Sequence, residues 1–513
     1  FSSNISKSLN TLKFFAQLLR HFLGIIINQS IRNAIISYSG IIIGFISTII
    51  LFPYILGAER FGLTRTLIAI MTICVQLVNL GIPNSIIKFF PFLAEKTKNP
   101  QGLFWLFIIP PSVGLIIFVL IFLGLKDTLL GFYSDSSLLA DYYYLIIPLV
   151  FSVAPFGLLN SFIKASFNTV FASFLQEILL RLVVIVDLIL FYFGLISFDQ
   201  FIIIFVLNYT LQYIILFVYA LQKGYLNFSP SKKPFDKTAR KNITQYSFFA
   251  FFSGFTTILV GNIDLIMVDI FEGLEKTGVY AVALYVGAVI SIPRRSISKI
   301  SFPVISRSFK ENDLNNIDDV YKKSSLNQLL IGLLIYIGVL ANIDNLYALL
   351  PEVFAEGSIV IMIIGLANLF DVSTGANGQI IISSKYYKFD FISSSILMIV
   401  SIILNAILIP LYGLTGAAIA TASSIGIYNI IKMIYVWVKF DMQPFGSRTL
   451  GVIALGISVF YISTLLPQLS NIYFDVVIRS IVMALLYLGS VWFFNLSEEI
   501  NGIIKGVVKR IKN

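Results

Sequence analysis

Long apolar segments recur along the whole chain, each followed by a short polar stretch. Each segment has the length of about twenty residues that a helix needs to span the hydrocarbon of a bilayer, and almost no charge. The pattern predicts an all-α polytopic membrane protein with about fourteen transmembrane helices, near residues 33–55, 63–86, 102–124, 142–163, 171–195, 200–221, 246–269, 278–300, 327–343, 357–376, 391–411, 414–436, 449–467 and 474–495.

The basic residues give these helices an orientation. Loops that stay in the cytoplasm hold an excess of Lys and Arg. With the N-terminus inside, the inner segments hold 30 of the 36 basic residues, whereas the outer loops hold only Arg60, Lys126 and Lys276. We therefore expect both termini in the cytoplasm.

Composition excludes several other classes of protein. With 58% hydrophobic and 12% charged residues and a mean hydropathy of +0.90, the chain has too much apolar surface for a water-soluble domain. The net charge of +10 is spread over alternating loops, so we expect no nucleic-acid partner. One cysteine, Cys74, and one histidine, His21, give no disulfide frame and no His/Cys metal site, and we expect no cofactor.

Internal repetition is the most informative feature. The turn from Gly57 to Gly62 (GAERFG) recurs from Gly273 to Gly278 (GLEKTG) at an offset of 216, and Ser39-Gly40 and Phe90-Pro91 recur at nearly the same spacing. The repeat predicts two parallel six-helix lobes related by pseudo-two-fold symmetry, with two further helices at the C-terminus. The expected domains are an N-terminal cytoplasmic or interfacial tail (1–32), an N-lobe (33–221), a basic cytoplasmic linker (222–245), a C-lobe (246–436), two added helices (437–498) and a basic tail (499–513).

The repeated residues also carry a family resemblance. The run from Leu56 to Gly62 resembles the first outer turn of bacterial polysaccharide transporters, the Wzx-type O-antigen flippases. The segment from Asn262 to Tyr280 resembles their seventh and eighth helices, and Phe302-Pro303 and the run from Tyr412 (YGLTGAA) match later landmarks. The resemblance covers roughly Gly24 to Arg510, and it implies membership of the multidrug, oligosaccharidyl-lipid and polysaccharide exporter superfamily.

The resemblance implies a function. Such a protein moves polyprenyl-pyrophosphate-linked oligosaccharides of O-antigen, capsule or exopolysaccharide across the bacterial cytoplasmic (inner) membrane, with the sugar head in a hydrated cavity. The implied partners are this lipid-linked substrate and membrane lipid, with the polymerase and glycosyltransferases of the same pathway as further candidates. The alternative within the superfamily is a multidrug and cation antiporter.

Basic residues near the spans are candidates for binding the pyrophosphate, because an anion needs cationic partners. Arg294, Arg295 and Lys299 lie toward the inner end of the eighth span, where they could equally be ordinary topology anchors. Arg65 lies in the outer half of the second span, against the positive-inside trend. It either faces a cavity or pairs with Glu59, and we expect the pairing.

Acidic residues within spans are candidates for coupling transport to an ion gradient, because unpaired charges in lipid are costly. Glu177 and Arg181 are four residues apart and favour a structural pair, with a role in substrate or ion passage as the alternative. Asp187 could take up and release a proton. Asp264 of the seventh span could have a functional or a structural role. In the tenth span, Asn368 and Asp371 could bind sugar hydroxyls or join helices.

The chain gives no sign of an enzyme. A polymerase or ligase of the same pathways would need catalytic groups on the outside, yet every predicted outer loop is short and none carries a histidine. We find no nucleophile motif, metal cluster or phosphate-binding glycine loop, so we expect no catalytic residues.

Overall fold

A computed structural model gives the fold and describes residues 31–95, 99–133, 137–166, 168–227 and 237–499, together with residues 29, 229, 501 and 502. Over these residues the secondary structure is helical, without strands. Eleven helical segments are long and apolar enough to cross a membrane, and every predicted span lies on helix. Most of the predicted tails, 1–32 and 499–513, lies outside the described residues.

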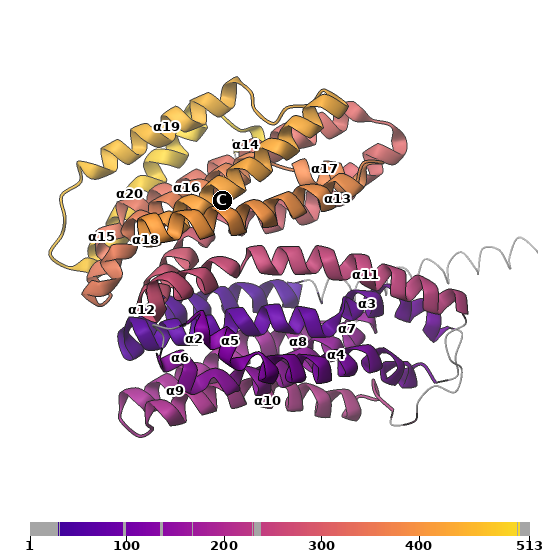
Figure 1. The fold of residues 1–513 in the computed structure, drawn as a ribbon. Coiled ribbons are helices and arrows are strands. Elements are labelled where there is room, and N and C mark those ends of the chain that lie inside the picture. Colours follow the sequence, from indigo (N-terminus) through magenta and orange to yellow (C-terminus); the bar gives the residue numbers. More distant parts are fainter. Residues whose placement is uncertain are drawn as a thin grey trace, which may run out of the picture. The chain divides into compact units, whose positions relative to one another are not determined.

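The helices form two compact units. The first unit holds the described residues up to Ser47, Cys74–Lys126 and Tyr142–Gly254. Its helices are a segment over residues 31–45, α3 (Ile82–Ala94), α4 (Phe104–Gly124), α7 (Ile146–Ala165), α8 (Val170–Phe174), α9 (Leu180–Tyr192), α10 (Phe198–Gln222) and most of α11 (Lys237–Val260) (Figure 1).

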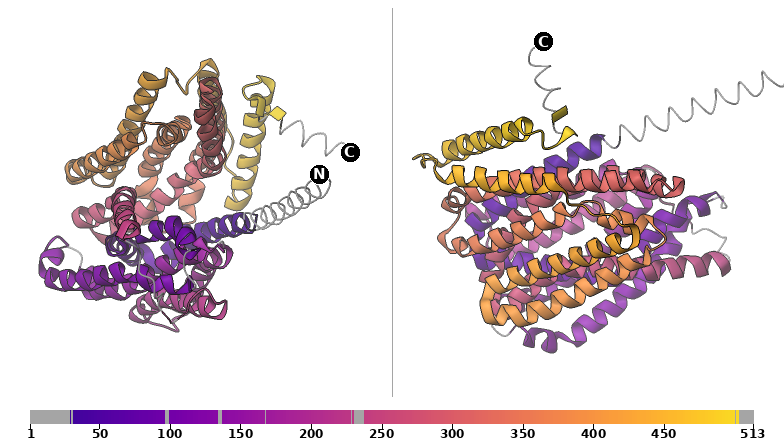
Figure 2. Two further views of the ribbon diagram at one scale, coloured as in Figure 1. Left: turned by 90° about the vertical axis from the view of Figure 1, so that its right-hand side faces the viewer. Right: turned by 90° about the horizontal axis from the view of Figure 1, so that it is seen from above.

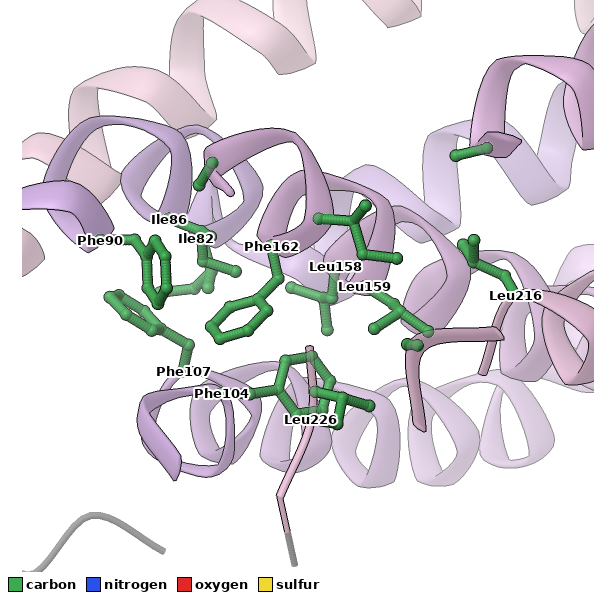
Figure 3. Packing of buried hydrophobic residues seen from close by; sticks show 14 of the residues in the cluster. Ile82, Ile86, Phe90, Phe104, Phe107, Leu158, Leu159, Phe162, Leu216 and Leu226 are labelled. Atoms are coloured by element: carbon green, nitrogen blue, oxygen red, sulfur yellow. The ribbon is translucent and has the colours of Figure 1, made fainter. Parts of the chain in front are cut away.

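Aromatic side chains fill the centre of the first unit. Phe90 of α3, Phe104 of α4 and Phe162 of α7 meet there with Leu158 (Figure 3). The ring of Phe162 lies 4.5 Å from that of Phe90 and 5.3 Å from that of Phe104, in tilted and edge-on geometry. Such pairs are favourable beyond their buried area, so they hold α3, α4 and α7 together.

The second unit holds Thr48–Ile73, Asp127–Asp141 and the chain from Phe255 onward. Its helices α19 and α20 pack against α14 (Figure 2). The helices of this unit are most of α2 (Phe52–Asn79), α5 (Lys126–Gly131), α6 (Ser137–Tyr142), α12 (Ile263–Ala288), α13 (Ile292–Glu311), α14 (Leu314–Ala341), α15 (Ile343–Ala348), α16 (Ser358–Ser373), α17 (Asn377–Ser383), α18 (Lys388–Phe440), α19 (Ser447–Thr464) and α20 (Ile472–Phe493).

Single glycines break the longest helices. Gly57 interrupts α2 with φ 75° and ψ 176°, and Gly273 interrupts α12 with φ 83° and ψ 175°. Gly413 breaks α18 in the same way, with φ 55°. A positive φ is open to glycine at little cost, which is why the chain turns at these residues. Gly57 and Gly273 begin the two repeated turns, and their nearly equal angles support the predicted repeat.

The second glycine of each repeated turn lets α2 and α12 cross closely. A Cβ atom at Gly62 would collide with the carbonyl oxygen of Leu274, and one at Gly278 would collide with the carbonyl oxygen of Ala58. Helices in membranes associate through such small residues, because lipid supplies no hydrophobic force between them. The crossing fixes the start of α2 against α12 and so positions the side chains that follow Gly62.

Candidate functional site

Arg65 is a buried cation on α2, one turn beyond Gly62. Its side chain is 7% exposed. The guanidinium carbon lies 5.0 Å from the ring centroids of both Phe52 and Phe61. One terminal nitrogen donates to the hydroxyl of Tyr285 on α12 at 3.2 Å, and Nε donates to Thr64 Oγ1 at 3.3 Å. Aromatic faces and two hydroxyls therefore surround this charge.

The expected pairing of Arg65 with Glu59 is wrong. Among the described residues no carboxylate lies within ion-pair distance of Arg65. The two residues are six apart, which leaves their side chains about 120° from each other around a helix. Glu59 is exposed, whereas Arg65 points into the unit. The other expectation, that Arg65 faces a cavity, stays a prediction.

A guanidinium has five N–H donors, and the structure gives Arg65 two hydrogen bonds. Aromatic faces compensate a buried cation only in part, by about 0.5–2 kcal/mol each. Burial of a charge without a counter-ion is costly, so such a group is usually functional in a membrane protein. Arg65 is therefore suited to receive an anion.

Asp264 of α12 forms a second buried centre, in which oxygen and amide groups converge. Its side chain is 6% exposed and accepts hydrogen bonds from Asn405 Nδ2 at 2.8 Å, from the Thr421 hydroxyl and from the Tyr280 hydroxyl at 3.5 Å. Asn405 and Thr421 lie on α18, on either side of Gly413. Within the described residues Asp264 has no basic partner, and the buried Oδ1 of Asn405 has no hydrogen bond.

The structure joins Arg294 and Asp371, which the sequence presented as two separate candidates. Arg294 of α13 forms an ion pair with Asp371 of α16, and the two side chains are 33% and 12% exposed. Asn429 of α18 donates to the other carboxylate oxygen at 2.8 Å. The charge of Arg294 is thus compensated within the bundle. Of the neighbouring candidates, Lys299 is exposed, and the side chain of Arg295 lies outside the described part of the chain.

Asn368 has a packing role in the structure. Its amide donates to the backbone oxygens of Gly287 at 3.2 Å and Ile364 at 3.1 Å, so it joins α16 to α12. This is the interhelical use that the sequence left open beside sugar binding. The contact lies next to Gly287, where a Cβ atom would come within 2.7 Å of the Ile364 side chain.

The remaining acidic candidates lie in the first unit. Glu177 pairs with Arg181 at 3.1 Å, as the four-residue spacing predicts, and Arg181 also donates to the backbone oxygen of Gly40. Asp187 of α9 is 4% exposed and accepts a hydrogen bond from Asn208 of α10. Asn208 and Gln212 line a small pocket beside it. Arg181 thus connects α9 to the helical segment 31–45, and Asp187 connects α9 to α10.

Sequence reasoning missed several polar residues of α18. Asn405 and Thr421 each stand within apolar windows and could have been noticed as lone polar residues. Lys432 is 3% exposed and was counted only as a basic residue that sets topology. It forms an ion pair with Asp390 at 2.7 Å and donates to the Tyr428 hydroxyl at 2.6 Å.

Comparisons with known proteins relate the chain to proteins of glycan biosynthesis. Residues 30–309 match the family described as polysaccharide biosynthesis protein. TuaB of Bacillus subtilis, a teichuronic acid biosynthesis protein, is 22% identical over 71% of this chain and 75% of its own length. The probable low-salt glycan biosynthesis flippase Agl15 of Haloferax volcanii is 24% identical over 46% of this chain and 50% of its own length.

CapF, a capsular polysaccharide biosynthesis protein of Staphylococcus aureus, is 28% identical over 36% of this chain and 48% of its own length. The chain thus spans about half the length of Agl15 and CapF in these matches. The structure of the lipid II flippase MurJ in an inward closed conformation has a TM-score of 0.67 and 17% identity, over 90% of this chain and 98% of that one. The structure of an inward-facing multidrug transporter of the MATE family has a TM-score of 0.59 and 12% identity, over 76% of this chain and 92% of that one.

The two solved structures share the fold of this chain, which confirms the predicted helical membrane architecture. The family match covers more than half of the 513 residues. It includes both repeated turns, Arg65, Asp264 and Arg294. The chain belongs to the family of polysaccharide biosynthesis proteins.

Proposed function

We propose that the protein is a flippase that moves polyprenyl-pyrophosphate-linked oligosaccharide repeat units of O-antigen, capsule or exopolysaccharide across the bacterial inner membrane. Family membership supports this proposal, as do relatives named for glycan, capsule and teichuronic acid biosynthesis. Both termini lie in the cytoplasm, as the basic residues predict. The protein is a transporter rather than an enzyme.

The observation that carries the proposal is the environment of Arg65. A pyrophosphate is doubly anionic, and arginine binds phosphate oxygens through two parallel N–H bonds. Arg65 is 7% exposed and lacks a carboxylate partner among the described residues, so its free donors can bind such a group. The sugar head follows the pyrophosphate through the protein, while the polyprenyl tail stays in lipid. The two predicted lobes rock to expose Arg65 to each side in turn.

Asp264 couples this movement to an ion. The carboxylate, the free Oδ1 of Asn405 and the hydroxyl of Thr421 are hard oxygen ligands close to one another. A buried carboxylate without a basic partner can hold a cation or a proton, and either one lowers the cost of its burial. Asp187 is the corresponding candidate of the first unit, with a smaller set of partners.

The test is to delete the gene in its own organism and to measure membrane lipids and surface glycan. We expect a polyprenyl-pyrophosphate oligosaccharide to accumulate while the surface polysaccharide disappears, with recovery by the intact gene. Arg65→Ala should fail to restore the glycan although the protein reaches the membrane. Arg60→Ala is the matched control, because this exposed arginine lies in the preceding turn, and it should restore the glycan.

A multidrug or cation antiporter is the second candidate, because the MATE transporter shares the fold. The oxygen-rich site at Asp264 would suit a cationic substrate, whereas the uncompensated charge of Arg65 would repel one. Unchanged lipid intermediates and a normal surface glycan in the deletion strain, together with new sensitivity to cationic dyes, would contradict the flippase and favour the antiporter.

A further inference from the structure

Two serine hydroxyls link α3 and α11 in the first unit. Ser85 Oγ lies 2.6 Å from Ser247 Oγ, and the two residues are 0% and 6% exposed. Ser85 belongs to the second predicted span and Ser247 to the seventh. The hydrogen bond therefore joins the first predicted copy of the repeat to the second.

The backbones of these helices also touch next to the serine pair. Gly81, with φ 71°, precedes α3, and a Cβ atom there would lie 2.7 Å from the backbone nitrogen of Phe251. Gln76 donates to the Phe251 oxygen at 3.4 Å. Among the described residues, Ile243 is the one large side chain that α11 adds to the buried core cluster of this unit.

Beside the serine pair, Phe89 of α3 packs edge-on against Tyr246 of α11 with ring centroids 5.6 Å apart, and Lys88 Nζ lies 3.9 Å from the centroid of the Tyr246 ring. The contact thus combines a buried serine pair with one half-buried ring pair.

A second contact between the predicted copies is the crossing of Gly62 with Gly278. Gly62 lies within α2, and Gly81 follows the last residue of α2 by two positions. The two glycines are about 19 residues apart, which corresponds to about 28 Å along a helix. This length is close to the ~30 Å thickness of the hydrocarbon core. On the predicted topology Gly62 lies at the outer end of the second span, whereas Ser85 lies at the inner end of that span and Ser247 at the inner start of the seventh.

A transporter that works by alternating access must break one such contact while it keeps the other. We propose that the contact of Gly81 and Ser85 with Ser247 is the inner gate, which opens to admit the anionic head group from the cytoplasm. This inference rests on the proposed flippase function for its substrate, but the opening of the gate can be measured without substrate.

The test is a reversible covalent lock. Ser85→Cys and Ser247→Cys are introduced together in a Cys74→Ala background, and the protein is oxidised in the membrane with copper phenanthroline. A disulfide should form readily, because the two side chains are in contact. The locked protein should lose flipping at least tenfold, and a reductant should restore it.

The matched control is a hydroxyl pair within one predicted copy. Ser152 of α7 and Thr210 of α10 lie 2.7 Å apart, in the same unit. Ser152→Cys with Thr210→Cys in the same background should also cross-link, yet flipping should persist. Loss of flipping in both pairs would indicate general rigidity and would overturn the gate.

A second measurement separates the gate from the proposed function. Tyr285→Cys, at the exposed ring beside Arg65, is added to the locked pair, and inverted membrane vesicles are treated with an impermeant maleimide. Labelling should fall severalfold when the serine-site disulfide forms and should recover on reduction. Equal labelling in both states, a locked protein that still flips, or failure of the disulfide to form would each overturn the gate. A deletion strain with unchanged lipids would overturn the flippase alone.

Discussion

Arg65 and Arg294 are both membrane arginines of the second unit, yet the structure gives them opposite surroundings. Arg294 has a carboxylate partner in Asp371, which in turn is held by Asn429. Arg65 has aromatic rings and two hydroxyls. A cation with a carboxylate partner stabilises the fold through that ion pair, whereas a cation without one is available to an anionic ligand. We therefore expect the partners of a charge, rather than its place in a span, to separate structural from functional residues.

The strongest test of this comparison is Arg65→Lys, which keeps the charge and removes the planar guanidinium. We expect flipping to fall by about a hundredfold, because each lost charge-assisted hydrogen bond is equivalent to about 1.5–3 kcal/mol. Stability should change little, since no ion pair is broken. The measurement is the rate of lipid-linked oligosaccharide flipping in proteoliposomes, together with thermal unfolding in detergent. Normal flipping by the lysine variant would show that Arg65 provides only charge.

The converse test is Arg294→Ala, which leaves the carboxylate of Asp371 without its cation. Breaking a fully buried pair costs about 3–5 kcal/mol, and this pair is partly exposed, so we expect a loss of about 2 kcal/mol in unfolding free energy. Adding Asp371→Asn should restore much of that loss. Denaturation of the purified variants measures both values. An Arg294→Ala protein as stable as the parent would show that the ion pair of Arg294 with Asp371 does not stabilise the fold.

Asp264→Asn extends the comparison to an anion without a basic partner. The substitution is nearly isosteric and removes a buried charge, so we expect unchanged or higher stability. Flipping should fall about tenfold and become insensitive to an imposed sodium or proton gradient, because the coupling ion loses its charged ligand. Flipping rates with and without each gradient provide the measurement. A variant that still responds to the gradient would transfer the coupling role to Asp187.

The smallest expected effect is that of Tyr285→Phe, which removes one hydrogen bond from Arg65 and keeps the ring. One such bond contributes about 1 kcal/mol, which corresponds to roughly a fivefold change in an equilibrium constant. We expect a rise in KM for the lipid-linked substrate with little change in maximal rate, since the hydroxyl orients Arg65. A fall in maximal rate alone would place Tyr285 in the conformational step instead.

Much of the fold could be predicted from the sequence, because lipid imposes a fixed length and an apolar composition on every span. The repeated turns were equally readable, since glycines at Gly57 and Gly273 mark positions that few other residues can occupy. The boundaries of the two lobes stay a prediction.

The partners of the candidate residues could not be predicted in the same way. Arg65 meets Tyr285 across 220 positions of sequence, and Asp264 meets Asn405 across 141. Local spacing found the pair of Glu177 and Arg181, because four residues make one helical turn. The pairing of Arg65 with Glu59 failed because proximity in sequence was taken for proximity around the helix. Contacts between distant helices depend on packing that a single sequence does not reveal.

The crossing of α2 with α12 is reciprocal, because Gly62 approaches Leu274 while Gly278 approaches Ala58. The repeat offset of 216 relates Gly62 to Gly278 and Ala58 to Leu274. Two identical chains that associate around a two-fold axis make the same kind of isologous contact. The crossing therefore has the geometry of an isologous interface, although both of its sides belong to one chain. In a homodimer one substitution changes both sides of such an interface, whereas here Gly62 and Gly278 can be substituted one at a time.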